Sequence, residues 1–353
     1  MKIRIKERLV GEDEPVYFVA DIAANHDGDL GRAKKLIELA KAAGADAAKF
    51  QHHRVAHYVS KLGFESLGGQ LSHQKKWDKP VFEVYKDAQV PLDWTAELKA
   101  HCDKVGIHFF STAYDLEMVD LLDPYVPAFK VGSGDINFPQ MLTRVASKHK
   151  PVLLATGAST MGEVQKAVGL IRGTNPDLVL MQCNTNYTGS ADNFKYINLN
   201  VLKTYRQMYP DLVPGLSDHT PGHATVLGAI ALGARVVEKH FTDDTSRKGP
   251  DHPFSMDPAA WREMVDRSRE LEAALGSPER QVAPNEQETL VLQRRCLRAC
   301  AQIKKGTLIP PAMIEFQRPA PPGSFEPSFI RSLVGRAATR DIREGEHFSF
   351  DNI

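Results

Sequence analysis

Two histidines stand at matching positions in the stretch "GLSDHTPGHATVLGAIALGARVVEKHF", residues 215–241. Each closes a short apolar run, His219 after "VPGLSD" and His240 after "RVVEK", and a helix-like segment separates the two runs. Because strand side chains alternate with a period of two, His219 shares a face with Ser217, and His240 shares one with Glu238. Two imidazoles at the ends of neighbouring strands can share one divalent cation, leaving positions for water or substrate.

This arrangement predicts a metal site on His219 and His240, with Glu238 as an acceptor that orients an imidazole. The alternative is two unconnected histidines, one of them a core residue. His223 and His252 lie in predicted loops and are weaker candidates for ligands.

Two lysines interrupt otherwise apolar runs, Lys49 in "DAAKFQ" and Lys130 in "PAFKVGSG". A buried lysine is costly unless it is paired or faces an anion. With Thr112, Ser133 and Thr156 nearby, the lysines outline a site for a small phosphorylated carboxylate. A Schiff-base lysine is the competing interpretation. A lysine aldolase needs no metal, so the histidine pair weighs against it.

These residues need a scaffold that brings strand ends together. Eight strand candidates occupy residues 16–24, 46–51, 107–113, 127–134, 151–157, 178–184, 213–219 and 235–241. Helical patterns follow them, including "TMGEVQKAVGLIRG" with a capping-box pair and "DPAAWREMVDRSRELEAALG" with an early proline. The repeated unit predicts a (β/α)8 TIM barrel, an α/β fold, with an open doubly wound sheet as the competitor.

The ends of the predicted strands are polar, as the carboxyl face of a barrel requires for chemistry. They carry Asp21, Asn25, Lys49, Gln51, Ser111, Thr112, Lys130, Ser133, Thr156, Asn184, Ser217, Asp218, His219, Glu238 and His240. Polar groups at eight successive strand ends favour a functional site over random solvated tails.

Three further segments complete the predicted organisation. Residues 52–93 are longer than an ordinary strand–helix loop, which is typical of a lid. We expect a barrel domain over 1–275, a polar linker over 276–288 and a small β-rich domain over 289–353. Within the last, "AQIKKGTLIPPAMI" and "RDIREGEHFSFDNI" form a weak repeat.

Composition excludes several classes. Among 353 residues, 44 Lys and Arg balance 44 Asp and Glu, which argues against a general nucleic-acid binder. No apolar run reaches membrane-spanning length, and the charged start does not resemble a signal peptide. The four cysteines show no zinc spacing and are too few for a disulfide framework, so we interpret Cys296 and Cys300 as small apolar residues. We expect a soluble cytoplasmic protein.

The motifs "FVADIAANHDGDL", "AAKFQ", "FSTAYD", "FKVGSGD", "LLATGAST", "GLSDHT", "EKHFTDD" and "GPDHPFSM" resemble the sialic acid (N-acetylneuraminate) synthase family. That family includes legionaminic and pseudaminic acid synthases and spore-coat polysaccharide relatives. The similarity covers nearly the whole chain, because the C-terminal segment resembles the family's antifreeze-like SAF domain.

The resemblance implies a condensation of phosphoenolpyruvate with an N-acetylated aldose, typically N-acetylmannosamine, to a nine-carbon 2-keto-3-deoxy acid plus phosphate. It implies Mn²⁺ or Mg²⁺ on His219 and His240, which act in catalysis with Asp21, Lys49 and Lys130. It further implies a domain-swapped homodimer in which a SAF-domain arginine reaches the partner's active site. The residues implied in substrate binding are Gln51, Thr112, Ser133, Asp135, Thr156, Asn184, Tyr187, Ser217, Asp251 and that arginine, Arg318.

The chain departs from the family pattern at Asp21, Asp135 and Ala155 and in the segment "QCNTNYTG" of the sixth predicted strand. Asp21 and Asp135 stand where glutamate is usual, and Ala155 replaces a serine on the phosphate side. Shortening a carboxylate by one carbon can break a direct hydrogen bond and make room for a larger acceptor. The resulting hypothesis is that the preferred sugar differs from plain N-acetylmannosamine. A metal-dependent pyruvate aldolase and a non-enzymatic carbohydrate- or ice-binding protein are the alternatives.

Overall fold

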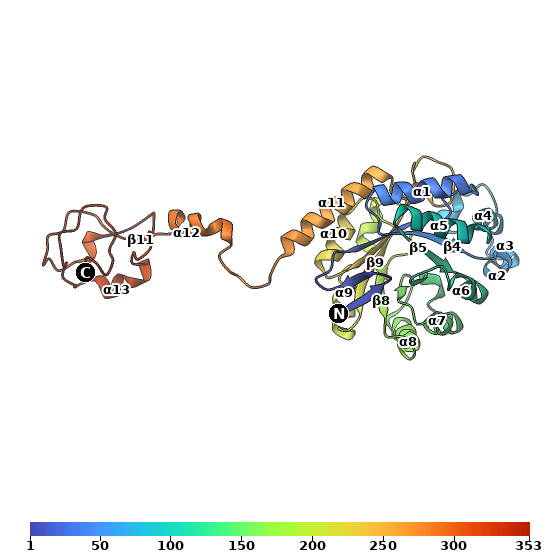
Figure 1. The fold of residues 1–353 in the computed structure, drawn as a ribbon, viewed down its shortest axis with the longest axis horizontal. Helices are drawn as coiled ribbons and strands as arrows, with labels where there is room; N and C mark the ends of the chain where they lie inside the picture. The colour runs from blue at the N-terminus through green and yellow to red at the C-terminus, as the bar shows by residue number, and fades with distance from the viewer. The chain divides into compact units, whose positions relative to one another are not determined.

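The computed structural model describes residues 1–353 and divides into two compact units, Met1–Gly276 and Ser277–Ile353. The first unit is a closed barrel of eight parallel strands, in the order β10, β3, β4, β5, β6, β7, β8, β9 (Figure 1). The strands are β3 (Tyr17–Asp21), β4 (Ala47–His52), β5 (His108–Ala113), β6 (Phe129–Val131), β7 (Val152–Ala155), β8 (Leu178–Cys183), β9 (Val213–Asp218) and β10 (Val236–His240). Each overlaps one predicted strand. The open sheet is excluded because β10 pairs with both β9 and β3.

Helices surround the strands, as Figure 1 shows. They are α1 (Leu30–Ala42), α5 (Trp94–Val105), α6 (Leu116–Leu122), α7 (Pro139–Ala146), α8 (Met161–Arg172), α9 (Val201–Met208), α10 (Ala224–Ala231) and α11 (Pro258–Leu275). The predicted capping box of α8 is present, with Thr160 and Glu163 bonding reciprocally. None of the helices combines the length and apolar character that crossing a bilayer demands.

An N-terminal hairpin that the sequence did not reveal precedes the barrel. It consists of β1 (Lys2–Ile5), in which charged residues alternate with isoleucines, and β2 (Arg8–Gly11). Its Ile3, Ile5 and Val10 share one buried cluster with residues of the early parts of the barrel strands, such as Tyr17 and Val236. The hairpin therefore fills the amino-terminal end of the barrel, opposite the end where the polar strand tails gather.

Residues 54–92, here called the cap, separate β4 from α5 and correspond to the predicted lid. The cap contains α2 (Val55–Tyr58), α3 (Lys61–Glu65), the short 3₁₀ helix η1 (Ser72–Lys76) and α4 (Val81–Asp87). Val55, Val59 and Val81 form a small core of its own, and aromatic side chains pack against that core. The long segment is therefore an ordered element with its own hydrophobic cluster.

The second unit contains the antiparallel pair β11 (Cys296–Ala299) and β12 (Ile314–Gln317), together with α12 (Gln287–Gln293) and α13 (Ile330–Leu333). The last residues of the predicted linker enter η5 (Pro284–Glu286) and α12. The two repeated phrases meet at an antiparallel bridge between Ile303 and Ile342. All four cysteines of the chain are free.

Candidate active site at the carboxyl end of the barrel

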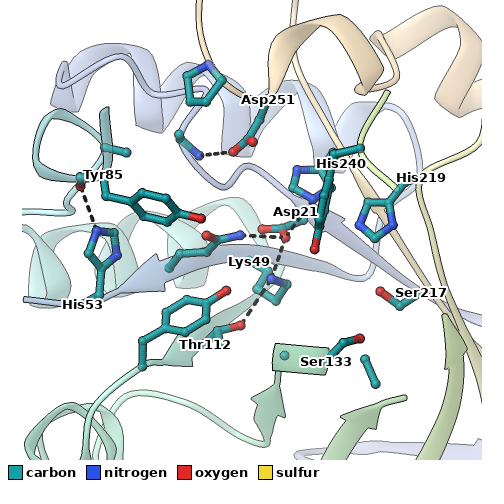
Figure 2. A pocket seen from close by; sticks show the side chains of 18 of the residues that line it. Asp21, Lys49, His53, Tyr85, Thr112, Ser133, Ser217, His219, His240 and Asp251 are labelled. Atoms are coloured by element: carbon teal, nitrogen blue, oxygen red, sulfur yellow. Dashed lines mark hydrogen bonds and ion pairs between the residues drawn. The ribbon is translucent and has the colours of Figure 1, made fainter. Parts of the chain in front are cut away.

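A cavity of about 140 Å³ lies at the carboxyl ends of the barrel strands. Figure 2 shows how side chains from several strands and from the cap converge on it. The predicted site residues that line it are Asp21, Lys49, Gln51, Thr112, Lys130, Ser133, Tyr187, Ser217, His219, His240 and Asp251. Residues from widely separated parts of the chain thus meet in one pocket, as the carboxyl face of a barrel allows.

The histidine pair forms one wall of this cavity. The imidazole centroids of His219 and His240 lie 5.4 Å apart, and both side chains are buried. His219 Nδ1 donates to the carbonyl oxygen of Asn184 at 2.9 Å, so its Nε2 carries the free lone pair. Burial lowers the pKa of His219, and burial together with the neighbouring His219 lowers the pKa of His240 well below its usual range. Both rings are therefore neutral near pH 7, the form that binds a metal.

The donor set fits a divalent cation with open positions. His240 Nδ1 is buried without a hydrogen-bond partner, and His240 Nε2 lies 3.7 Å from Asp21 Oδ2. No group of three or more His, Cys, Asp or Glu side chains has metal-binding geometry anywhere in the chain. A cation held by the two imidazoles would therefore complete its coordination with water or substrate oxygens.

Lys49 and Asp21 form a fully buried ion pair beside the histidines. Lys49 Nζ lies 2.6 Å from Asp21 Oδ2, and each side chain is 2 % exposed. Gln51 Nε2 donates to the same carboxylate oxygen at 3.2 Å, and Lys49 also donates to Thr112 Oγ1 at 3.3 Å. Burial alone would lower the pKa of Lys49, but the carboxylates of Asp21 and Glu238 raise it. The two carboxylates therefore favour the protonated form of Lys49.

Glu238 lies between the two predicted lysines. Its Oε1 is 3.6 Å from Lys49 Nζ and 3.7 Å from Lys130 Nζ, while its Oε2 is buried without a hydrogen-bond partner. The sequence predicted that Glu238 orients an imidazole, but no hydrogen bond joins it to either histidine. In the structure it lies between two buried cations, and together with Asp21 it balances the formal charges of Lys49 and Lys130.

Asp251 faces the cavity from the loop that follows β10 (Figure 2). Its Oδ2 accepts a hydrogen bond from the Ala24 backbone N–H at 3.1 Å. Burial raises the pKa of Asp251 to about 7, and the negative charge of Asp21 adds to that effect. A carboxyl group that titrates near neutrality inside a cavity can take or give a proton there.

The cap supplies an aromatic wall that the sequence did not predict residue by residue. Tyr58, His73, Trp77 and Tyr85 of the cap line the cavity, together with His53 and Tyr114, which directly follow β4 and β5. His53 Nε2 donates to the Tyr85 carbonyl oxygen at 2.9 Å, and its Nδ1 is buried without a partner. The signal that could have found this wall is the density of histidine, tyrosine and tryptophan within residues 52–93.

An outer cavity of about 870 Å³ adjoins the first. His73, Trp77 and Tyr187 line both cavities. The Tyr187 ring lies 5.0 Å from His73 and 4.3 Å from His219, centroid to centroid. The two cavities therefore share an aromatic boundary next to the histidine pair.

Four predicted substrate-binding residues lie outside the cavity lining. Thr156 follows β7 and points outward, where its Oγ1 donates to the Met181 carbonyl oxygen and accepts from the Tyr205 hydroxyl. Asn184 holds His219 through its backbone carbonyl. Asp135 lies in the turn after β6 with a buried, unpartnered Oδ2, and burial raises its pKa to about 6. Arg318 belongs to the second unit.

Comparison with known proteins places this architecture in a family. The chain is 36% identical to an uncharacterised protein of Methanocaldococcus jannaschii, over 100% of this chain and 98% of that protein. It is 33% identical to N-acetylneuraminate-9-phosphate synthase of Homo sapiens, over 96% of this chain and 93% of that enzyme. It is 32% identical to N,N'-diacetyllegionaminic acid synthase of Campylobacter jejuni, over 93% of this chain and 97% of that enzyme.

The solved structures agree with these relatives. The crystal structure of the spore coat polysaccharide biosynthesis protein SpsE from Bacillus subtilis matches with a TM-score of 0.66 and 30% identity, covering 100% of this chain and 99% of that chain. Residues 36–280 match the NeuB family, and residues 294–353 match the SAF domain. The predicted family is confirmed, and with it the SAF identity of the second unit. The chain is an enzyme that belongs to the NeuB family of sialic acid-type synthases.

Proposed function

We propose that the protein condenses phosphoenolpyruvate with an N-acetylated aldose, such as N-acetylmannosamine, to a nine-carbon 2-keto-3-deoxy acid and inorganic phosphate. The observation that carries the proposal is the meeting of two buried lysines and a neutral histidine pair in one cavity. The names of the human and Campylobacter relatives support a sialic acid-type product.

The lysine side of the cavity suits the donor. Lys49 and Lys130 are nine-tenths or more buried, and the hydroxyls of Thr112, Ser133 and Ser217 line the same cavity. A dianionic phosphate and a carboxylate would replace the weak contacts at 3.6 and 3.7 Å that Glu238 makes with the lysines. We infer that phosphoenolpyruvate binds here, against two lysines that Asp21 and Glu238 already hold in place.

The histidine side suits the aldehyde of the acceptor. His219 and His240 would hold Mn²⁺ or Mg²⁺, and the bound ion would supply Lewis-acid polarisation of the aldehyde oxygen. Gln51, Tyr187 and Asp251 surround the remaining space and present hydrogen-bonding groups to the sugar. Asp251, with its pKa of about 7, can pass a proton to the oxygen that becomes the new hydroxyl.

The proposed step balances without a further reactant. C3 of phosphoenolpyruvate forms a bond to the aldehyde carbon, water adds its oxygen at C2, and the bond between C2 and the phosphate oxygen breaks. One proton of the water ends on the new hydroxyl and the other on the released phosphate. Lys49 and Lys130 would hold the phosphate while its charge increases.

Two alternatives share this site. An acceptor-variant synthase of the legionaminic or pseudaminic type would use the same donor side and differ only at the sugar. A metal-dependent pyruvate aldolase would release no phosphate. The protonated state of Lys49 argues against a Schiff-base aldolase, because imine formation requires a neutral amine.

The decisive experiment supplies the full chain with Mn²⁺, phosphoenolpyruvate and N-acetylmannosamine, and measures phosphate release and product mass. We expect product that disappears with EDTA, with His219→Ala and with His240→Ala, but persists with His223→Ala, whose side chain lies outside the cavity. Phosphate release only with another N-acetylated aldose would identify an acceptor variant. Turnover of pyruvate without phosphate release would overturn the proposal.

The proposed assembly is a domain-swapped homodimer in which Arg318 reaches the partner's acceptor site. Its support is the resemblance to the family. The measurement is the solution mass of the full chain, followed by mixing Arg318→Ala chains with His240→Ala chains. Recovery of activity in the mixture, beyond either variant alone, is expected only if each site draws residues from two chains.

A further inference from the structure

A buried ion pair joins the outer faces of β9 and β10 directly before the two histidines. Lys239 Nζ lies 2.5 Å from Asp218 Oδ2, and each side chain is 1 % exposed. In the strand register Lys239 stands opposite Asp218, the last pair of the ladder between these strands. His219 and His240 are the next residues on the two strands, so the ion pair fastens the strands at the point where the histidines leave them.

The same pair also fixes the chain beyond His219. Lys239 Nζ donates to the Thr220 carbonyl oxygen at 2.7 Å. Asp218 Oδ1 accepts from the Thr220 backbone N–H at 3.2 Å, and Asp218 Oδ2 accepts from the Thr225 hydroxyl of α10 at 2.7 Å. His219 is therefore held from the outside by bonds to both of its sequence neighbours.

On the inner side, a single hydrogen bond fixes the His219 ring, the one to the Asn184 carbonyl oxygen. Neither Asp218 nor Lys239 lines the cavity, because their side chains alternate with those of Ser217, Glu238 and the histidines. The pair cannot touch substrate. Any influence on the reaction must pass through the position of the histidines.

We propose that Asp218 and Lys239 are positioning residues that set the separation and orientation of His219 and His240 for one divalent cation. A buried ion pair is weak support for stability, since apolar residues of similar volume often serve as well. Residues behind metal ligands, by contrast, commonly change metal affinity by about 10- to 100-fold. The inference rests on the proposed metal site at the histidine pair.

The test separates positioning from folding by using a charge-neutral double variant. Asp218→Asn or Lys239→Met alone leaves one buried charge without its partner and lowers the melting temperature. The double variant Asp218→Asn/Lys239→Met removes both charges at similar volume, so its melting temperature returns toward that of the wild type. The readout is the Kd for Mn²⁺ alone, measured by calorimetry without substrates. We expect the double variant to bind Mn²⁺ about tenfold more weakly.

The matched control is the ion pair between Arg8 and Asp46, a partly exposed pair at the amino end of the barrel. Its double variant Arg8→Met/Asp46→Asn should leave the Kd for Mn²⁺ unchanged. An unchanged Kd in a folded Asp218→Asn/Lys239→Met protein would overturn the inference. If His219→Ala also left Mn²⁺ binding unchanged, the proposed metal site itself would fail, so the two failures are distinguishable.

Discussion

The two walls of the cavity differ in how they are built. One wall, here called the strand wall, is formed by the cavity-lining residues of the barrel strands. It carries buried charges that pair with one another, as Lys49 pairs with Asp21. The cap wall carries half-buried aromatic side chains such as Trp77 and Tyr85, which pack against each other with ring centroids 6.0 Å apart. Fixed charges on one wall suit the small anionic donor that we propose, whereas an aromatic wall on a separate element suits the proposed sugar acceptor.

This difference predicts that substitutions in the strand wall abolish the reaction with every acceptor sugar. Lys49→Met should lower kcat/KM for phosphoenolpyruvate by about 10³-fold, since the proposed site for the departing phosphate loses a positive charge. Because Asp21 and Glu238 then lie buried without that cation, the variant should also lose about 3–5 kcal/mol of unfolding free energy.

A second variant keeps this first prediction testable if Lys49→Met does not fold. Lys49→Met/Asp21→Asn removes the pair together and should recover stability but no activity. The measurements are chemical denaturation and phosphate release with each of several N-acetylated aldoses. If the folded double variant had wild-type kcat/KM, Lys49 would not contribute to donor binding, and the proposed difference between the two walls would be wrong.

Substitutions in the cap wall should weaken binding of the acceptor without changing use of the donor. Trp77→Ala removes an aromatic face shared by both cavities, and we expect the acceptor KM to rise about tenfold. The value of kcat/KM for phosphoenolpyruvate at saturating acceptor should stay within about twofold. Steady-state kinetics with each substrate varied in turn provide the check.

The matched control for Trp77→Ala is Phe82→Ala. Phe82 packs on the small cap core but lines neither cavity, so its loss should destabilise the cap without this selective effect. Equal losses for donor and acceptor in Trp77→Ala would mean that the cap serves both substrates.

The contrast between the walls also explains what the sequence could predict. The strand wall follows from a period of two, because Ser217 and His219 must share a face once β9 is recognised. The barrel itself was predictable because eight apolar runs alternate with helical patterns. Family resemblance supplied Tyr187 and Asp251, which lie in loops without such a period.

The cap wall could not be derived in the same way. Tyr58, His73 and Trp77 reach the cavity only because short helices fold over a three-valine core, and no local spacing encodes that path. The N-terminal hairpin was not predicted for a related reason, since its isoleucines become buried only where they pack against the end of the barrel. Thr156 was predicted to bind substrate because it lies at a strand end. In the structure Ala155, the last residue of β7, lines the cavity, whereas Thr156 faces the helix layer.

Asp251, which lines the cavity from the loop after β10, couples the site to pH. Its folded-state pKa, about 7, lies above the unfolded value of about 3.8, so the native state holds this proton longer. Stability from this group is therefore full at low pH and is lost as pH rises from about 4 to 7. Asp251→Asn removes the titration and still accepts the Ala24 hydrogen bond.

The Asp251→Asn variant should consequently gain stability over the wild type at pH 8, on the order of 1–2 kcal/mol after allowance for its partial exposure. The gain should vanish near pH 4, and acceptor turnover should fall. Thermal denaturation across this pH range measures the effect. A gain that is constant with pH would show that Asp251 does not titrate between these values in the folded protein.

Substitution of Thr156 should have the smallest effect on activity, because this residue lies just outside the strand wall. Its hydroxyl bonds the Met181 carbonyl oxygen and the Tyr205 hydroxyl, away from the cavity. Thr156→Val preserves shape but leaves the Tyr205 hydroxyl without its acceptor, while the Met181 carbonyl oxygen keeps its bond from the backbone N–H of residue 156. The lost bonds should cost about 1–2 kcal/mol of unfolding free energy. Because no substrate contact is lost, kcat/KM for both substrates should stay within about twofold.

Ala155, one residue earlier, does line the cavity, so Ala155→Ser offers the comparison: it should change the KM for phosphoenolpyruvate while leaving stability nearly unchanged. If Thr156→Val instead impaired the donor KM, the substrate would have to reach behind β7, and the alternation that defines the strand wall would fail at this strand.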